Sequence, residues 1–328
     1  MAHIAAAFAT SHSLMLAADL KDWLVGFRAS DPRMPYFDKS GRETTYQELL
    51  QKAPPNAADF ITDEVITERY EKTHKAMDRL RAGIAAANLD VLIIAGDDQH
   101  ELFDDSNMPS IGIYYGDRIL NKRRPLREEL DWFKRAQLQR LEPERDIEYP
   151  VDSPLALHLI QGLRDRNFDI AAIKELRDGQ YEGHAFSYIH RYCIPSLNLP
   201  VVPIFLNTWF PPNQPTPKRC LQLGDALASI IAEYPSDMRI GALASGGLSH
   251  FIVDEEMDQG IIQALKHGTP EILADLDPGK LKAGSSEIRN WIVLAGLVRN
   301  MKLSWISYIP AYRSLALTGT GLGFAVWQ

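Results

Sequence analysis

Three polar clusters in the 328-residue chain combine side chains that can bind a metal ion or move a proton. His12 follows a short apolar run, the polar segment 97–101 follows a second run, and His250 shortly precedes the acidic stretch 254–256. Imidazole and carboxylate groups together form the two-histidine, one-carboxylate sites that hold non-haem iron and leave coordination positions open. The three clusters therefore indicate a candidate metal site.

Each cluster also has an ordinary structural interpretation. An acidic stretch such as 254–256 commonly forms the first turn of a helix, where carboxylates interact favourably with the helix dipole. Asp97 and Asp98 have the residue type that caps a helix, and a single histidine at the end of a strand is often structural. Residue type and spacing alone leave both interpretations open.

The segments that carry these clusters have the pattern of an α/β protein. The continuous β-branched run 90–96 is typical of a strand that is buried on both faces of a mostly parallel sheet. Further strands are predicted at 4–9, 110–115, 170–173, 201–206, 240–244 and 305–309. Helices are predicted at 63–87, 155–166, 218–233, 256–267 and 286–299.

Because strands alternate with helices along the chain, we expect one domain over residues 1–328 with a central, mostly parallel sheet flanked by helices. Ligands bind beyond the carboxyl ends of the strands in such sheets, which is where the polar clusters would meet. A helical excursion over about 19–88 is expected to cover the site. The glycine-rich tail 318–323 is expected to form a flexible, turn-rich closure.

Composition narrows the class of protein without identifying it. A formal net charge of −8 argues against nucleic acid as a partner, because phosphate binding needs a basic face. No apolar run approaches the roughly 20 residues that span a bilayer, so no membrane partner is expected. Two cysteines are too few for a disulfide scaffold and suit a cytoplasmic location.

Several motifs occur along the chain in a fixed order. They are Thr10-Ser11-His12, Gly183-His184-Ala185-Phe186, Pro203 to Thr208 with the proline-rich loop 211–217, and Ser245 to His250 with its acidic follower. Together they resemble the class III extradiol ring-cleaving dioxygenase family, the superfamily of the protocatechuate 4,5-dioxygenase catalytic β subunit. The tail from Tyr312 to Phe324 resembles its methylgallate dioxygenase-like branch.

This resemblance implies Fe(II) held by two histidines and one glutamate. His12 matches the first histidine, and Glu256 matches the carboxylate, with Glu255 as the alternative if the register shifts by one residue. Mn(II) remains a possible metal in place of Fe(II).

The second histidine is where the chain departs from the family pattern. Gln99 falls on the expected ligand position, and His100 follows one residue later. We favour His100 as the metal ligand, because neutral imidazole suits Fe(II) better than a carboxamide does. Gln99 and Glu101 stay open as alternatives.

The resemblance also implies roles for residues outside the metal site. His184 matches the acid–base histidine, and His250 is expected to orient a metal ligand or to line the pocket. Asn207, Tyr312 and Arg313 are candidate substrate-binding residues, since an arginine can hold a carboxylate in bidentate fashion.

The implied function is a non-haem Fe(II)-dependent extradiol dioxygenase that cleaves a catechol- or gallate-type ring with O₂. Its partners would be an aromatic small molecule and O₂, and the expected assembly is a homodimer. An aminophenol-type ring-cleaving enzyme is one alternative. A non-catalytic family member that acts as a partner subunit is another, favoured by Gln99 and by Asp152, which stands where some relatives have an active-site histidine.

Overall fold

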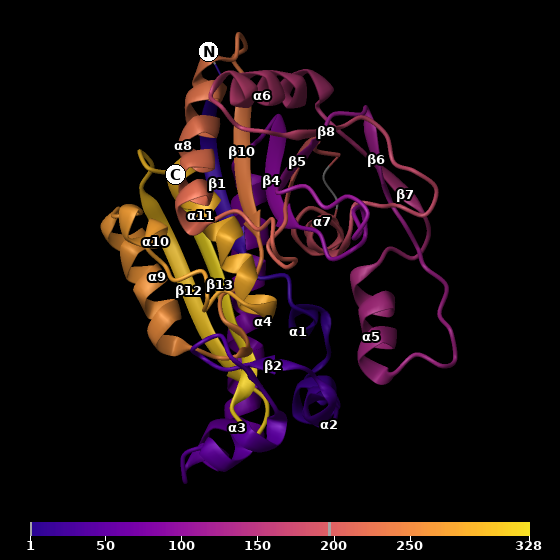
Figure 1. Cartoon of the computed structure of the whole chain (residues 1–328), viewed down its shortest axis with the longest axis vertical. Coiled ribbons are helices and arrows are strands. Elements are labelled where there is room, and N and C mark those ends of the chain that lie inside the picture. The colour runs from indigo at the N-terminus through magenta and orange to yellow at the C-terminus, as the bar shows by residue number, and fades with distance from the viewer. Residues whose placement is uncertain (1, 196–197) are drawn as a thin grey trace.

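Small and β-branched apolar residues form four neighbouring parallel strands at the centre of the molecule. In spatial order these are β1 (His3–Thr10), β10 (Arg239–Ser245), β4 (Val91–Asp97) and β9 (Val201–Leu206). Strands β4 and β9 are buried along their whole length, as expected for parallel strands that are covered on both faces. The computed structural model describes residues 2–195 and 198–328 (Figure 1).

Antiparallel strands extend this parallel centre at both flanks. The nine-stranded sheet has the order β11-β13-β1-β10-β4-β9-β5-β8, and β12 also pairs with β13. The outer strands are β5 (Ile111–Tyr114), β8 (Ala171–Ile173), β11 (His250–Ile252), β12 (Leu303–Tyr312) and β13 (Thr318–Trp327). The prediction of an α/β fold with a central sheet flanked by helices is confirmed.

Helices cover both faces of the sheet and form two apolar cores with it. One core contains residues of α6 (Ser153–Asp165), α8 (Pro217–Glu233), α9 (Glu255–His267), α10 (Glu271–Ala274) and α11 (Ile288–Leu297). The other contains residues of α1 (Leu14–Ala17), α2 (Phe27–Ser30), α4 (Asp63–Ala86), α5 (Trp132–Leu141) and α7 (His184–Tyr188). Figure 1 shows α8 and α11 crossing in front of the strands.

The segment between β1 and α4 lies beyond the end of the sheet at which β1 finishes (Figure 1). It contains α1, α2, a β2–β3 hairpin (Tyr36–Phe37 and Glu43–Thr44) and α3 (Tyr46–Lys52). Thr45 and Glu48 form a capping box that starts α3, so polar side chains rather than an apolar core define this helix. The described helices include none that is long and apolar enough to cross a membrane.

For the tail, the prediction is wrong. We expected 318–323 to be a turn-rich closure, but these residues begin β13, a fully buried strand that pairs with three others. Its glycines are explained by close packing, because a Cβ at Gly321 would lie 2.1 Å from Asp258 Oδ2. The sequence also gave no indication of α5 or of a hairpin formed by β6 (Arg118–Asn121) and β7 (Ile147–Pro150).

Candidate metal centre

Four side chains with metal-binding atoms converge at the end of the sheet. His12 follows β1, Asp97 ends β4, His184 is the first residue of α7, and Glu287 ends a 3₁₀ helix (Ala283–Glu287) that leads into α11. One candidate ligand atom from each residue lies within 4.8 Å of the others. We call these four residues the acidic–imidazole cluster. Its position beyond the carboxyl ends of parallel strands is the usual place for a ligand site.

Hydrogen bonds fix which nitrogen of His12 faces the cluster. The Ser245 hydroxyl donates to Ala185 O at 2.7 Å, so its oxygen is left to accept from His12 Nδ1 at 3.1 Å. His12 Nε2 then lies 3.1 Å from Glu287 Oε2 and 3.7 Å from Asp97 Oδ1. In the described part of the chain, neither His12 Nε2 nor Asp97 Oδ1 has a hydrogen bond of good geometry.

Glu287 is held by contacts on both carboxylate oxygens. Oε2 accepts from the Gly247 N–H at 2.7 Å, and Oε1 lies 3.3 Å from His250 Nε2 and 3.5 Å from Gln99 Nε2. Burial by itself would raise the pKa of Glu287, but His12 and His250 outweigh it and hold the pKa well below its usual value. The group is therefore a carboxylate in the folded protein.

His184 is held by a buried glutamate that belongs to the loop after β4. His184 Nδ1 lies 2.5 Å from Glu101 Oε1, and Glu101 also accepts from the backbone N–H of Gln99 at 2.6 Å and of His184 at 3.3 Å. Burial opposes a charge on His184, yet Glu101 raises the pKa of the imidazole to about 10. Gly183 permits this approach: its φ is +84°, and a Cβ there would lie 3.2 Å from the Glu101 carboxyl carbon.

The electrostatics of the cluster favour a bound cation. Asp97 is fully buried, and burial together with the charge of Glu287 raises its pKa. Burial, with Glu101 nearby, raises the pKa of Asp98 to about 7. Concentrating buried carboxylates is costly unless positive charge compensates them. A divalent cation would supply that charge and would pair with the unsatisfied atoms of His12 and Asp97, and an imidazole–carboxylate donor set fits iron or manganese.

Of the three second-ligand candidates in 97–101, the structure directs His100 away from the cluster. The backbone of His100 has φ +67°, and its ring stacks on Phe210 with centroids 3.9 Å apart. Its Nε2 lies 3.4 Å from Asp105 Oδ1. Gln99 lies at the cluster, where its Nε2 donates to Asp97 Oδ2 at 3.1 Å, and Glu101 reaches His184 instead.

The predicted carboxylate ligands lie in the first turn of α9, outside the cluster. Glu256 is exposed and lines a surface hollow beside Ile272 and Leu273. Glu255 accepts a hydrogen bond from Tyr312 at 2.6 Å. Acidic residues at this position are explained by the start of α9, where they interact favourably with the helix dipole.

The remaining predicted site residues divide into one that contacts the cluster and three that bond elsewhere. His250 is the one that contacts it, through Glu287. Asn207 bonds the backbone of Phe210, and Tyr312 bonds Glu255. Arg313 is buried and forms an ion pair with Asp31 at 2.8 Å, which ties the β12–β13 turn to the segment after α2.

No ligand role was predicted for Asp97 or Glu287. Asp97 lies in the polar segment 97–101, for which the sequence left a metal site and a helix cap both open, and it directly ends a run of buried strand residues. Glu287 sits at the start of a segment that was predicted as a helix. The available signal was a single acidic side chain just before the apolar run of α11, where every residue is buried.

Two small hollows reach the neighbourhood of the cluster. One is lined by His184 together with Arg124 and Tyr181. The other is lined by His250 and by Phe37, Asp38 and Lys39, so the segment between β1 and α4 lies beside His250.

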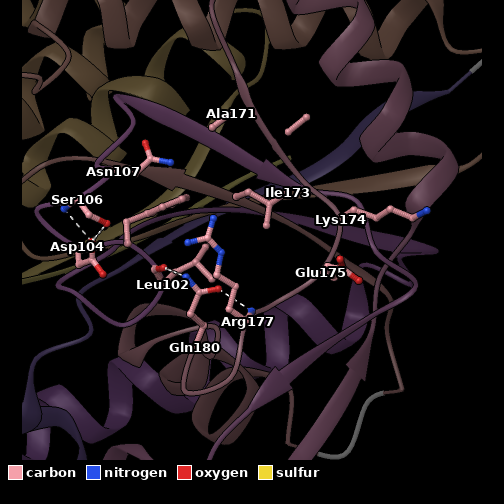
Figure 2. Close-up of a pocket in the computed structure, with 12 residues that line it drawn as sticks. Leu102, Asp104, Ser106, Asn107, Ala171, Ile173, Lys174, Glu175, Arg177 and Gln180 are labelled. Carbon is pink, nitrogen blue, oxygen red and sulfur yellow. Dashed lines mark hydrogen bonds between the residues drawn. The ribbon is translucent and has the colours of Figure 1, made fainter.

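A larger hollow, shown in Figure 2, adjoins the loop after β4 and edge strand β8. Leu102, Arg177 and Gln180 line it, and Gln180 Nε2 donates to Leu102 O. None of the four cluster residues lines this hollow, which separates it from the candidate metal centre.

Comparisons with known proteins agree with this chemistry. A model of the family described as the catalytic LigB subunit of aromatic ring-opening dioxygenase matches residues 71–323. Gallate dioxygenase of Pseudomonas putida is 27% identical over 184 residues, which cover 51% of this chain and 53% of that protein. A 2,3-dihydroxyphenylpropionate/2,3-dihydroxicinnamic acid 1,2-dioxygenase of Comamonas testosteroni is 33% identical over 102 residues, 30% of each chain. The matches thus span about half and about a third of these relatives' lengths.

Proposed function

Because the chain belongs to the family of catalytic LigB subunits of aromatic ring-opening dioxygenases, we propose that it is an extradiol dioxygenase that opens a catechol- or gallate-type ring with O₂. Both oxygen atoms enter the ring-opened product. The observation that carries the proposal is the convergence of the acidic–imidazole cluster at the carboxyl ends of β1 and β4. The two relatives, which are named as dioxygenases of dihydroxylated or trihydroxylated aromatic acids, support it.

The metal in this proposal is Fe(II), held by His12 Nε2 and by the carboxylate of Glu287, with Asp97 beside them. Glu287 takes the role that the sequence motif predicts for Glu256. Bound Fe(II) supplies Lewis acidity toward a ring hydroxyl and redox chemistry toward O₂. The protein contributes by directing His12 Nε2 at the cluster, by holding Glu287 as a carboxylate and by keeping His12, Asp97 and Glu287 buried from bulk water.

His250 is the residue placed to take a proton from the substrate. Its Nδ1 lies 2.8 Å from Leu248 O, to which it donates, so Nε2 is the atom that can hold or release a proton. Nε2 faces Glu287 at 3.3 Å, and although burial opposes a charge there, Glu287 raises the pKa of His250. A histidine so placed can accept the proton of a ring hydroxyl and return it later in the reaction.

Anaerobic loading with Fe(II), followed by desalting, tests this function. We expect one iron per chain and consumption of one O₂ per ring opened, with a coloured product, when catechols, gallates and aminophenols are supplied in turn. A protein that retains no stoichiometric iron, or that retains iron but consumes no O₂ with any of these rings, would contradict the proposal. Turnover of aminophenols alone would move the substrate class to nitrogen-bearing rings.

A further inference from the structure

We propose that His184 supplies the second imidazole ligand of the metal through Nε2, and that Glu101 is the residue that positions it. The inference rests on one part of the proposed function, which is that the acidic–imidazole cluster binds a metal ion. The loop after β4 has Gln99 at the position where a histidine ligand is expected. The imidazole of His184, from α7, would replace that ligand.

The candidate ligand atoms are close enough together to share one metal ion. Two ligand atoms that each lie about 2.1 Å from one metal ion are at most about 4.2 Å apart. The candidate atoms of His12, Asp97, His184 and Glu287 already lie within 4.8 Å of one another, so small side-chain movements bring His184 into a shared coordination sphere. The rings of His12 and His184 meet edge to face with centroids 4.7 Å apart, an arrangement that lets both point at one ion.

The hydrogen bond to Glu101 determines which nitrogen of His184 can bind a metal. Glu101 Oε1 lies 2.5 Å from His184 Nδ1, so Nδ1 holds its hydrogen in this bond and Nε2 is the nitrogen at which a metal ion can replace a proton. Metal-binding histidines in proteins almost always donate their other N–H to a carboxylate, a carbonyl or water. His12 has the same arrangement with Ser245. Both imidazoles are therefore prepared as ligands by a hydrogen bond from Nδ1.

Glu101 is held in place by hydrogen bonds from backbone N–H groups to both of its carboxylate oxygens. Its carboxylate is buried and accepts from the N–H of Gln99 and from the N–H of His184, in addition to the imidazole. These contacts join the loop after β4 to the start of α7. Replacing Glu101 would release the ring of His184 while leaving both strands of the site in place.

The other candidates for a second imidazole or its substitute are occupied elsewhere. His100 stacks on Phe210 and faces Asp105. Gln99 turns its amide nitrogen, which has no lone pair to donate, toward the carboxylates of Asp97 and Glu287. In the structure Gln99 thus acts as a hydrogen-bond donor to ligands.

Proton NMR of the Co(II)-substituted protein in H₂O tests the proposal, because each imidazole bound to Co(II) gives one strongly shifted, exchangeable N–H signal. We expect two such signals, from His12 and His184, and one in His184→Gln. In Glu101→Gln we expect the His184 signal to move or broaden, the His12 signal to remain, and Co(II) affinity to fall about 10- to 100-fold. His190→Asn, which lies on the helical segment after α7, is the matched control and keeps both signals.

Two outcomes would overturn the inference. One is a wild-type protein with a single shifted signal. The other is a His184→Gln protein that keeps both signals and wild-type affinity for Co(II), in which case His184 is free to act as the acid–base residue. Gln99→His is a second variant, for the case in which His184→Gln does not fold. It leaves His184 and its contacts in place and is expected to keep the two shifted signals of His12 and His184. Since these readouts count ligands, a metal-loaded protein that opens no ring would contradict the proposed function and leave this inference intact.

Discussion

Two histidines that lie six residues apart in the chain each pair with a buried glutamate, and the two pairs differ in what surrounds them. His184 pairs with Glu101 at 2.5 Å, and His190 pairs with Glu182 at 3.3 Å. His190 stacks flat on Tyr149, with ring centroids 3.5 Å apart, whereas His184 meets the ring of His12 edge to face. The charges of Asp97 and Glu287 also act on His184.

The difference teaches that a buried histidine–carboxylate pair is not in itself a functional site. His190 stacks on the ring of Tyr149, and its partner Glu182 lies only eight residues earlier in the chain. The His184 pair joins segments 83 residues apart and brings a third carboxylate to two that are already close. Convergence of acidic groups that only a cation can compensate is what marks the second case.

The largest expected difference between the two pairs is in activity. His184→Ala should lower kcat/KM by more than about 100-fold, because even the partners of metal ligands are worth 10- to 100-fold. His190→Asn should leave kcat/KM unchanged and lower the free energy of unfolding by about 1–3 kcal/mol, because Glu182 loses its buried partner. O₂ uptake and urea denaturation measure the two effects. Equal losses of activity in both variants would remove the distinction between the pairs.

The next largest effect separates the two glutamates that could serve as the metal carboxylate. Glu287→Gln should leave the protein without stoichiometric iron after desalting, since it removes a buried ligand charge. Glu256→Gln changes an exposed group at the start of α9 and should retain iron. Metal analysis of the two proteins, prepared side by side, decides between them. Loss of iron from Glu256→Gln alone would return the role to the residue expected from sequence.

A smaller effect is expected when the carboxylate of each pair is neutralised. Glu101→Gln should weaken metal binding about 10- to 100-fold through the orientation of His184. Glu182→Gln should change the unfolding midpoint and leave metal affinity as it is, because the Glu182 pair does not reach the cluster. Competition against a chelator of known affinity gives the first quantity and thermal unfolding of the metal-free proteins gives the second. A metal affinity that falls equally in both would assign Glu101 a general structural role.

The sequence predicted the fold well wherever apolar runs and helical periodicity were strong. The β-branched run of β4 and the alternation of helices and strands were enough for the α/β class. The glycine-rich tail was predicted wrongly because glycine is generally uncommon in strands. At Gly321, however, the absence of a Cβ is what lets the strand approach α9. That reason lies in a neighbouring element and not in the tail itself.

Site residues were harder to predict because a shift of one residue along the turn changes which side chain points into the site. His12 could be anticipated from the end of a strand. His100 and Gln99 could not be distinguished, since the turn is set by Asp98, which accepts from the backbone N–H of Leu102 at 2.7 Å. Glu287 reaches the cluster from a 3₁₀ helix 190 residues further along the chain than Asp97, a proximity that no local pattern encodes.

Asp258 extends the comparison to a buried carboxylate whose hydrogen-bond partners, among the residues that the structure describes, are neutral. It accepts from the Ser249 N–H and hydroxyl and from the Tyr308 hydroxyl, at 2.6 to 2.8 Å. Burial raises its pKa from 3.8 to about 6, although these hydrogen bonds lower it, whereas the imidazole partners of Glu101 and Glu287 hold the pKa of those groups below its usual value.

The sign of the resulting pH dependence follows from linkage. The folded protein binds the Asp258 proton more tightly than the unfolded chain does, so this group's contribution to stability is lost as pH rises from about 4 through 6. Relative to Asp258→Asn, the metal-free wild-type protein should therefore lose up to about 3 kcal/mol between pH 4 and pH 7. Urea denaturation of both proteins across this range measures the difference, in which the other titrating groups cancel. If the wild-type protein instead gains stability relative to the variant as pH rises, neutral hydrogen bonds alone are enough to offset the effect of burial on the pKa of Asp258. Asp258 would then not differ from the carboxylates that are paired with imidazoles.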